Sequence, residues 1–188
     1  MQRIVLFGDD TLGGVANNQV TDAITKRVAT AFPQTQVINR SIPGHKTSDA
    51  LTHVNRDVVK LNPAAVVLGF GVNDVSVHDE IKPGIFTSNL HKLMQLIGPY
   101  KVILLSPPYT DAQKQPNHNW PRQLQLTLAA EYVAQQLNVP FINLLKKMQH
   151  SHYAAKAYLQ ADGRNLNELG WDLLMSLIKP LLTQLLKK

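Results

Sequence analysis

Two neighbouring aspartates, Asp9 and Asp10, directly follow the first apolar run of the chain, residues 3–7. In α/β proteins the junction between a buried strand and the next helix is a common place for a nucleophile or an anion site. Two adjacent negative charges suit neither role in its ordinary form. The pair therefore raises the question of whether it caps the helix, reacts, or holds a cation.

Three further polar stretches follow later apolar runs or precede the last helical segment. They are residues 39–47 (NRSIPGHKT), 71–74 (GVND) and 162–170 (DGRNLNELG). Ligands of open parallel sheets bind outside the carboxyl ends of the strands. We therefore expect these stretches and the aspartate pair to surround one crevice.

The elements that must position these stretches alternate between strands and helices. Apolar runs predict strands at residues 3–7, 35–40, 64–70, 101–106 and 139–144. Helical patterns lie near residues 12–32, 48–61, 84–97 and 121–138, and again after residue 166, where Pro180 should kink or split the last helix. Near-continuous apolar strands and regular alternation predict an α/β fold, a three-layer α/β/α sandwich with a five-stranded parallel sheet. No change in composition divides the chain, so we expect one domain over residues 1–188.

Composition excludes several classes of function. The 188 residues carry a net charge of +6 and contain no cysteine, which excludes disulfides, thiolate metal sites and cysteine nucleophiles. Lysine and arginine are scattered rather than gathered in a stripe with aromatic residues, so no nucleic-acid partner is predicted. The apolar run after Met1 is too short for a leader or a membrane span, and we expect a cytoplasmic protein.

Taken in order, the four polar stretches resemble the blocks of the SGNH (GDSL-type) hydrolase family, over residues 4 to about 180. That family carries a GDS block, a glycine block, a GxND block and a DxxH block at these places. The resemblance implies a flavodoxin-like fold and acyl transfer, in which a serine attacks an ester with help from a histidine and an aspartate. It assigns Gly44 and Asn73 to the oxyanion hole and Asp162 to the aspartate that orients the base.

Two positions depart from the family pattern. Asp10 stands where the family has its serine nucleophile, and Asn165 stands where it has its histidine base. An amide has no basic site near neutral pH, and loss of either group removes most of the rate in such enzymes. We therefore predict a catalytically impaired homologue that keeps a pocket for a small ester, acyl or sugar ligand, or for a protein partner.

Each departure also has a structural interpretation. Aspartate is a preferred residue at the start of a helix, so Asp10 is predicted to cap one. Asn165 and Glu168 have the spacing of a capping box before the last helix. Asp9 is expected to brace its loop rather than to react.

In other interpretations the protein is an active hydrolase of carboxylic esters. Asp10 could itself attack the substrate, or a displaced histidine could supply the base. The candidate histidines are His45, His78, His118, His150 and His152, of which His45 is nearest to Gly44 in the sequence. Alternatively, Asp9, Asp10, Asn73 and Asp162 could hold magnesium or calcium. We predict no cofactor and no metal, and the sequence leaves a homo-oligomer open.

Overall fold

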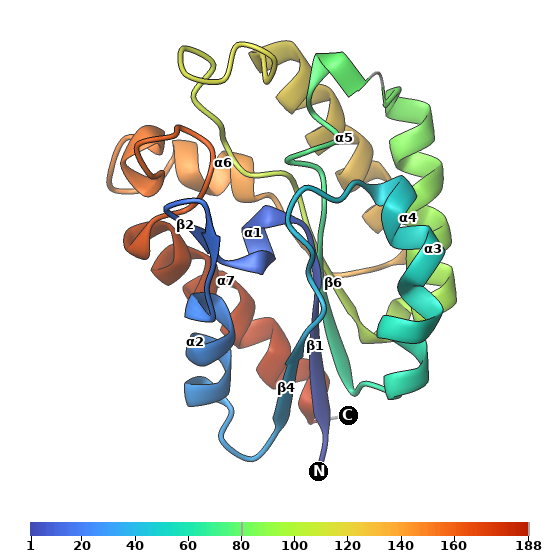
Figure 1. Cartoon of the computed structure of the whole chain (residues 1–188). Helices are drawn as coiled ribbons and strands as arrows, with labels where there is room; N and C mark the ends of the chain where they lie inside the picture. Colours follow the sequence, from blue (N-terminus) through green and yellow to red (C-terminus); the bar gives the residue numbers. More distant parts are fainter. Residues whose placement is uncertain (80, 188) are drawn as a thin grey trace.

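The structure of the protein is a computed structural model that describes residues 1–79 and 81–187 (Figure 1). Its main sheet has five strands, all parallel, in the order β4-β1-β5-β6-β7. The strands are β1 (Arg3–Gly8), β4 (Gln36–Asn39), β5 (Ala65–Gly69), β6 (Val102–Leu105) and β7 (Phe141–Ile142). The α/β class, the five parallel strands and their places in the sequence are therefore confirmed.

The strand order sets where a ligand site can form. From β1 the chain crosses to β4 on one side of it, and then returns to form β5 on the other side. This reversal is the flavodoxin-like arrangement, in which the crevice lies at the carboxyl ends of the strands beside the reversal. The residues that leave these ends are Asp9 after β1, residues 40–47 after β4 and residues 70–74 after β5.

Helices cover both faces of the sheet and complete three layers (Figure 1). Along β1, Val5 and Phe7 pack into one apolar core, whereas Ile4 and Leu6 pack into the other. The first core is closed by α3 (Thr47–Asp57), α4 (Pro83–Ile97) and α5 (Trp120–Leu137). The second is closed by α2 (Ala23–Ala31), α6 (Leu144–Gln149) and α7 (Glu168–Leu186). This alternation of buried side chains explains why the strands are apolar almost throughout.

Short elements complete the described chain. Helix α1 (Asp10–Gly13) follows β1, and four 3₁₀ turns lie at Val59–Leu61, Val77–Asp79, Pro99–Lys101 and Ala155–Tyr158. None of the helices in the described ranges is both long enough and apolar enough to cross a membrane.

The prediction of one helix over residues 12–32 is wrong in its first half. After α1 the chain forms an antiparallel hairpin of β2 (Val15–Ala16) and β3 (Gln19–Val20), and only then enters α2. The cause is local backbone geometry: Gly14, Asn17 and Asn18 all have positive φ, which a right-handed helix does not allow.

Pro180 does not split the last helix, which continues as α7 from Glu168 to Leu186. Apolar packing of Trp171, Leu174, Ile178 and Leu182 on the sheet holds the helix together across the proline. Tertiary burial thus outweighs the hydrogen bond that proline cannot donate.

Close contact between β1 and β5 brings Asp9 to the reversal point. Gly8 and Gly69 are paired in register at the ends of these strands, and the Asp9 N–H donates to the Gly69 carbonyl at 3.0 Å. A Cβ atom on Gly8 would lie 2.1 Å from that carbonyl oxygen, which is backbone and has little freedom to move. Position 8 therefore requires glycine, because a side chain there would clash with the end of β5 that positions Asp9.

Replacing Gly8 by alanine should accordingly destabilise the protein. Overpacking of this kind lowers the free energy of unfolding by roughly 1–3 kcal/mol or more. Gly84→Ala is the matched control, because Gly84 has open space around it in the first turn of α4 and should leave stability unchanged or raised by up to about 1 kcal/mol. Urea denaturation followed by circular dichroism measures both, and equal stability of the two variants would contradict the steric argument.

Candidate active site

Asp9 ties together the two loops at the reversal point. Its Oδ1 accepts the Thr11 N–H at 3.1 Å and so caps α1, while its Oδ2 accepts the N–H groups of Gly71 and Val72, both at 2.9 Å. The side chain is almost completely buried. Burial, followed by repulsion from Asp10, raises the pKa of Asp9 to about 8, against the lowering effect of its N–H donors. The prediction that Asp9 braces its loop is confirmed.

Asp10 contacts the loops after β4 and β5 instead of capping the helix. Its Oδ2 accepts the Gly44 N–H at 2.9 Å and the Asn73 Nδ2 amide at 2.7 Å. Its Oδ1 lies 3.0 Å from Nη2 of Arg164. The prediction that Asp10 caps α1 is therefore wrong, because Asp9 supplies the cap and leaves the Asp10 carboxylate free for these contacts.

The two donors that converge on Asp10 are the two that the resemblance assigned to the oxyanion hole. The turn at Gly44, with φ 83°, presents its N–H toward the crevice. The Asn73 amide is held by two contacts, since its Nδ2 also donates to the His45 carbonyl at 3.1 Å and its Oδ1 accepts from Arg164. One carboxylate oxygen of Asp10 thus accepts hydrogen bonds from both of these groups.

Arg164 is a residue of this candidate site that our sequence analysis missed. Its Nη2 donates to Asn73 Oδ1 at 2.5 Å and pairs with Asp10, so one guanidinium joins the loop before α7 to the loops after β1 and β5. A signal was present in the sequence: two adjacent carboxylates at a strand end need a cation, and Arg164 is the cation within the block that follows Asp162.

Asp162 and Asn165 form a pair in the same block. Asp162 Oδ2 accepts the Asn165 side-chain amide at 2.7 Å, and its Oδ1 accepts the backbone N–H groups of Arg164 and Asn165. The amide thus donates to the carboxylate as a histidine ring N–H would. Its remaining oxygen, Oδ1, is buried without a hydrogen-bond partner among the described residues.

Asn165 does not cap the last helix, so that prediction is also wrong. The N-cap of α7 is Asn167, whose side chain accepts the Gly170 N–H at 3.0 Å. The capping interaction lies two residues later than the sequence spacing with Glu168 indicated. Asn165 is therefore left to pair with Asp162 instead.

A second brace fixes the loop that carries Gly44. Asp74, which follows Asn73, accepts the Thr47 hydroxyl at 2.6 Å and the Thr47 N–H at 3.1 Å. Asn89 on α4 donates to the same hydroxyl at 3.1 Å. Burial raises the pKa of Asp74 to about 6, against the lowering effect of its hydrogen bonds to Thr47. This brace holds the loops after β4 and β5 against each other.

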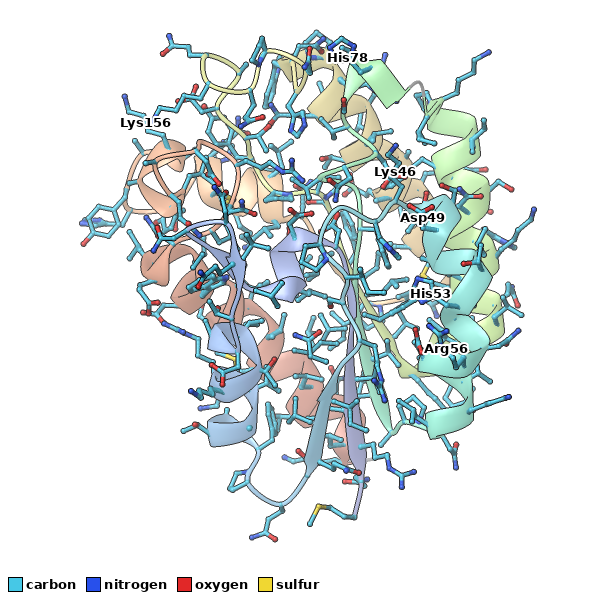
Figure 2. All side chains as sticks on the ribbon, in the orientation of Figure 1. Lys46, Asp49, His53, Arg56, His78 and Lys156 are labelled. Atoms are coloured by element: carbon cyan, nitrogen blue, oxygen red, sulfur yellow. The ribbon has the colours of Figure 1, made fainter. Side chains whose placement is uncertain are left out.

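His45 does not face Asp10 through its Nδ1 atom. That atom lies 3.2 Å from Nε2 of His53, and His53 Nδ1 lies 2.9 Å from an Asp57 carboxylate oxygen. Figure 2 labels His53 on α3. The carboxylates proposed for a cation are already engaged: Asp9, Asp10 and Asp162 all accept hydrogen bonds. Within the described ranges, no group of three or more histidine or acidic side chains could hold a metal ion.

Comparison with known proteins decides the family. The sequence profile of the GDSL-like lipase/acylhydrolase family matches residues 6–173. The chain belongs to this family. No curated protein sequence matches this GDSL-like chain.

Solved structures agree with that membership. The crystal structure of a lipase/acylhydrolase from Enterococcus faecalis is 34% identical, with a TM-score of 0.92 over 97% of this chain and 95% of that one. An acetylxylan esterase from Geobacillus stearothermophilus has a TM-score of 0.71 at 17% identity, over 95% of this chain and 93% of its own. At that identity the second comparison shows the shared SGNH hydrolase fold alone.

The Asp74 brace predicts a pH dependence of stability for this GDSL-like protein. The pKa of Asp74 rises from 3.8 to about 6 on folding, so between about pH 4 and 6 the folded protein keeps a proton that the unfolded chain has released. This group's contribution therefore lowers the free energy of unfolding as pH rises through that window, by at most about 3 kcal/mol. Asp74→Asn removes the titrating carboxyl, and the stability of the native protein relative to this variant should fall from pH 4 to 6 and then level off.

Urea denaturation at half-unit pH steps checks this expectation. Asp22→Asn is the matched control, since Asp22 is an exposed aspartate that pairs with Lys26 on the surface, and such pairs contribute little to stability. If the free energy of unfolding of the native protein differs from that of Asp74→Asn by the same amount at every pH, the raised pKa of Asp74 is refuted.

Proposed function

We propose that the protein is a catalytically impaired member of the GDSL-like family, which binds a small ester, acyl or sugar ligand without hydrolysing it. One observation carries the proposal: the Asp10 carboxylate accepts hydrogen bonds from both Gly44 and Asn73. In an active member of the family these donors would stabilise the charge that develops on the substrate. Here they contact a charge that belongs to the protein.

A filled oxyanion hole works against catalysis in two ways. Donors that already contact a full negative charge in the resting protein give no additional stabilisation in the transition state. A substrate oxygen that became negative beside Asp10 would also be repelled by that carboxylate. Each oxyanion-hole donor is worth about 3–4 kcal/mol in transition-state stabilisation, so the loss is large.

The position of the base supports the same conclusion. Asn165 donates to Asp162 as the family's histidine would, but an amide cannot take a proton from a nucleophile near neutral pH. Residue 165 thus keeps the hydrogen bond to Asp162 that would orient a base, but it lacks the ability of a base to accept a proton. The ligand class follows from the family and from the Enterococcus faecalis relative, which is named a lipase/acylhydrolase.

The second candidate is an active ester hydrolase that uses Asp10 as its nucleophile, favoured only by the position of Asp10 at the start of α1. Attack by its carboxylate on an ester would release the alcohol and leave a mixed anhydride for water to cleave. Against this, both Asp10 oxygens are engaged, one by Gly44 and Asn73 and the other by Arg164. Donors on both oxygens lower the nucleophilicity of the carboxylate.

Hydrolysis of a short-chain chromogenic ester distinguishes the two candidates. The proteins to compare are the native chain, Asp10→Ala and the double variant Asp10→Ser with Asn165→His. We expect the native chain to be no faster than Asp10→Ala, and the double variant to exceed both by about 100-fold or more, because it restores nucleophile and base beside an emptied oxyanion hole.

A fourth protein in this comparison tests the effect of Arg164 on the double variant. Adding Arg164→Ala to the double variant removes a guanidinium that has lost its partner at residue 10 and lies against Asn73. If the native chain hydrolyses the ester and Asp10→Ala does not, the proposal is overturned and Asp10 is a catalytic residue.

A further inference from the structure

An apolar groove with a cationic rim lies at the β7 edge of the sheet, lined by parts of α5, β7, α6 and α7. Its volume is about 900 Å³, which is within the range that holds small organic ligands. The residues that line it do not include Asp10, Gly44, Asn73 or Asp162, so the groove is separate from the crevice described above.

The apolar wall of the groove comes mainly from a stripe on α5. Trp120, Leu124 and Leu128 follow one another at four-residue spacing, and they are 42%, 38% and 54% exposed. The opposite side of α5 is buried against the sheet through Leu126 and Ala130. A helix that is apolar on both sides has one side left for a partner or ligand.

Side chains from the other elements close the groove. Phe141 of the edge strand β7 and Leu173 and Leu177 of α7 are half-buried and line it together with the α5 stripe. The groove therefore has apolar groups on several sides rather than on one flat face. A flexible aliphatic chain fits such a surface, because each methylene that it buries there is removed from water.

The rim of the groove is cationic. Lys146, Lys147 and His150, on α6 and just after it, are exposed and line the groove, and Glu131 is its acidic member. Lysine ammonium groups beside an apolar surface favour a ligand with an anionic head and an aliphatic tail.

The same charges disfavour a second copy of this chain as the occupant. A two-fold interface brings the same patch of both copies together, so the positive charge of this rim would be present twice in one interface. With a net charge of +6 on each chain, that arrangement is repulsive. A small anionic amphiphile meets no such repulsion.

We propose that this groove binds a free medium-chain fatty carboxylate, with its tail along Trp120, Leu124 and Leu128 and its carboxylate at Lys146 and Lys147. The proposal does not depend on whether the Asp10 crevice is catalytically impaired. It adds a second ligand site to the protein at the open edge of the sheet.

Titration with dodecanoate below its micelle concentration tests the proposal by isothermal calorimetry. We expect one saturable site per chain, and an affinity that falls as salt is added because a charge pair contributes. Dodecyltrimethylammonium has the same tail with a cationic head, and acetate has the same head without the tail. Both should bind at least 10-fold more weakly than dodecanoate.

Variants of the groove test separately how the tail and the head of the ligand contribute to binding. Leu128→Glu puts a carboxylate at an exposed position in the groove and should weaken dodecanoate binding at least 10-fold. Leu96→Glu is the matched control, since Leu96 on α4 is 45% exposed and lies outside the groove, and it should bind as the native chain does. The double variant Lys146→Gln with Lys147→Gln should weaken dodecanoate about 5-fold or more without weakening dodecyltrimethylammonium.

Three results would overturn the proposal. The first is equal binding of the two amphiphiles, or equal loss of binding in Leu128→Glu and Leu96→Glu, which would show non-specific adsorption. The second is an absence of saturable dodecanoate binding to the native chain. The third is a native dimer that Leu128→Glu alone makes monomeric, with no dodecanoate bound, which would make the groove an interface between copies. Light scattering after size exclusion measures that state, and circular dichroism confirms that each variant is folded.

Discussion

Two carboxylates next to each other at a buried strand end cannot both remain charged without partners, and Asp9 and Asp10 meet this constraint differently. Asp9 accepts hydrogen bonds from backbone N–H groups, which offset part of the rise of its pKa, to about 8, that burial and the neighbouring Asp10 cause. Asp10 instead pairs with Arg164 and with the donors from Gly44 and Asn73. The four polar stretches are joined through these contacts, since each contributes at least one atom.

Much of the fold followed from the sequence because its signals were regular. Apolar runs located all five strands of the sheet, and strand–helix alternation was enough to predict a parallel sheet with helices on both faces. The hairpin after α1 could not be predicted in this way, because it depends on positive φ at residues such as Asn17 and Asn18 within a stretch of helical composition. One domain over residues 1–188 and a cytoplasmic location remain predictions.

The site was predicted less completely than the fold. The contacts of Asp10 with Gly44, Asn73 and Arg164 confirm that the four stretches meet, whereas the crevice that we expected between them remains a prediction. The N-caps predicted from sequence spacing were wrong. Asp9 rather than Asp10 caps α1, and Asn167 rather than Asn165 caps α7. An N-cap depends on which of several neighbouring polar residues has extended backbone geometry, and composition does not fix that. The adjacent carboxylates indicate that a cation is needed, but the sequence does not show that the Arg164 side chain also reaches Asn73.

Asp10 and Asn165 contribute to the fold in different ways. Asn165 donates its side-chain amide to Asp162 and so links two residues of the loop before α7. The Asp10 carboxylate accepts from Gly44 and Asn73, and so gives the donors of two other loops a permanent charge to bind. Charge-assisted hydrogen bonds of this kind stabilise the folded state, and removal of one partner from a buried ion pair is costly. Through its contacts with Gly44, Asn73 and Arg164, the Asp10 carboxylate therefore holds three loops together at the carboxyl ends of the strands.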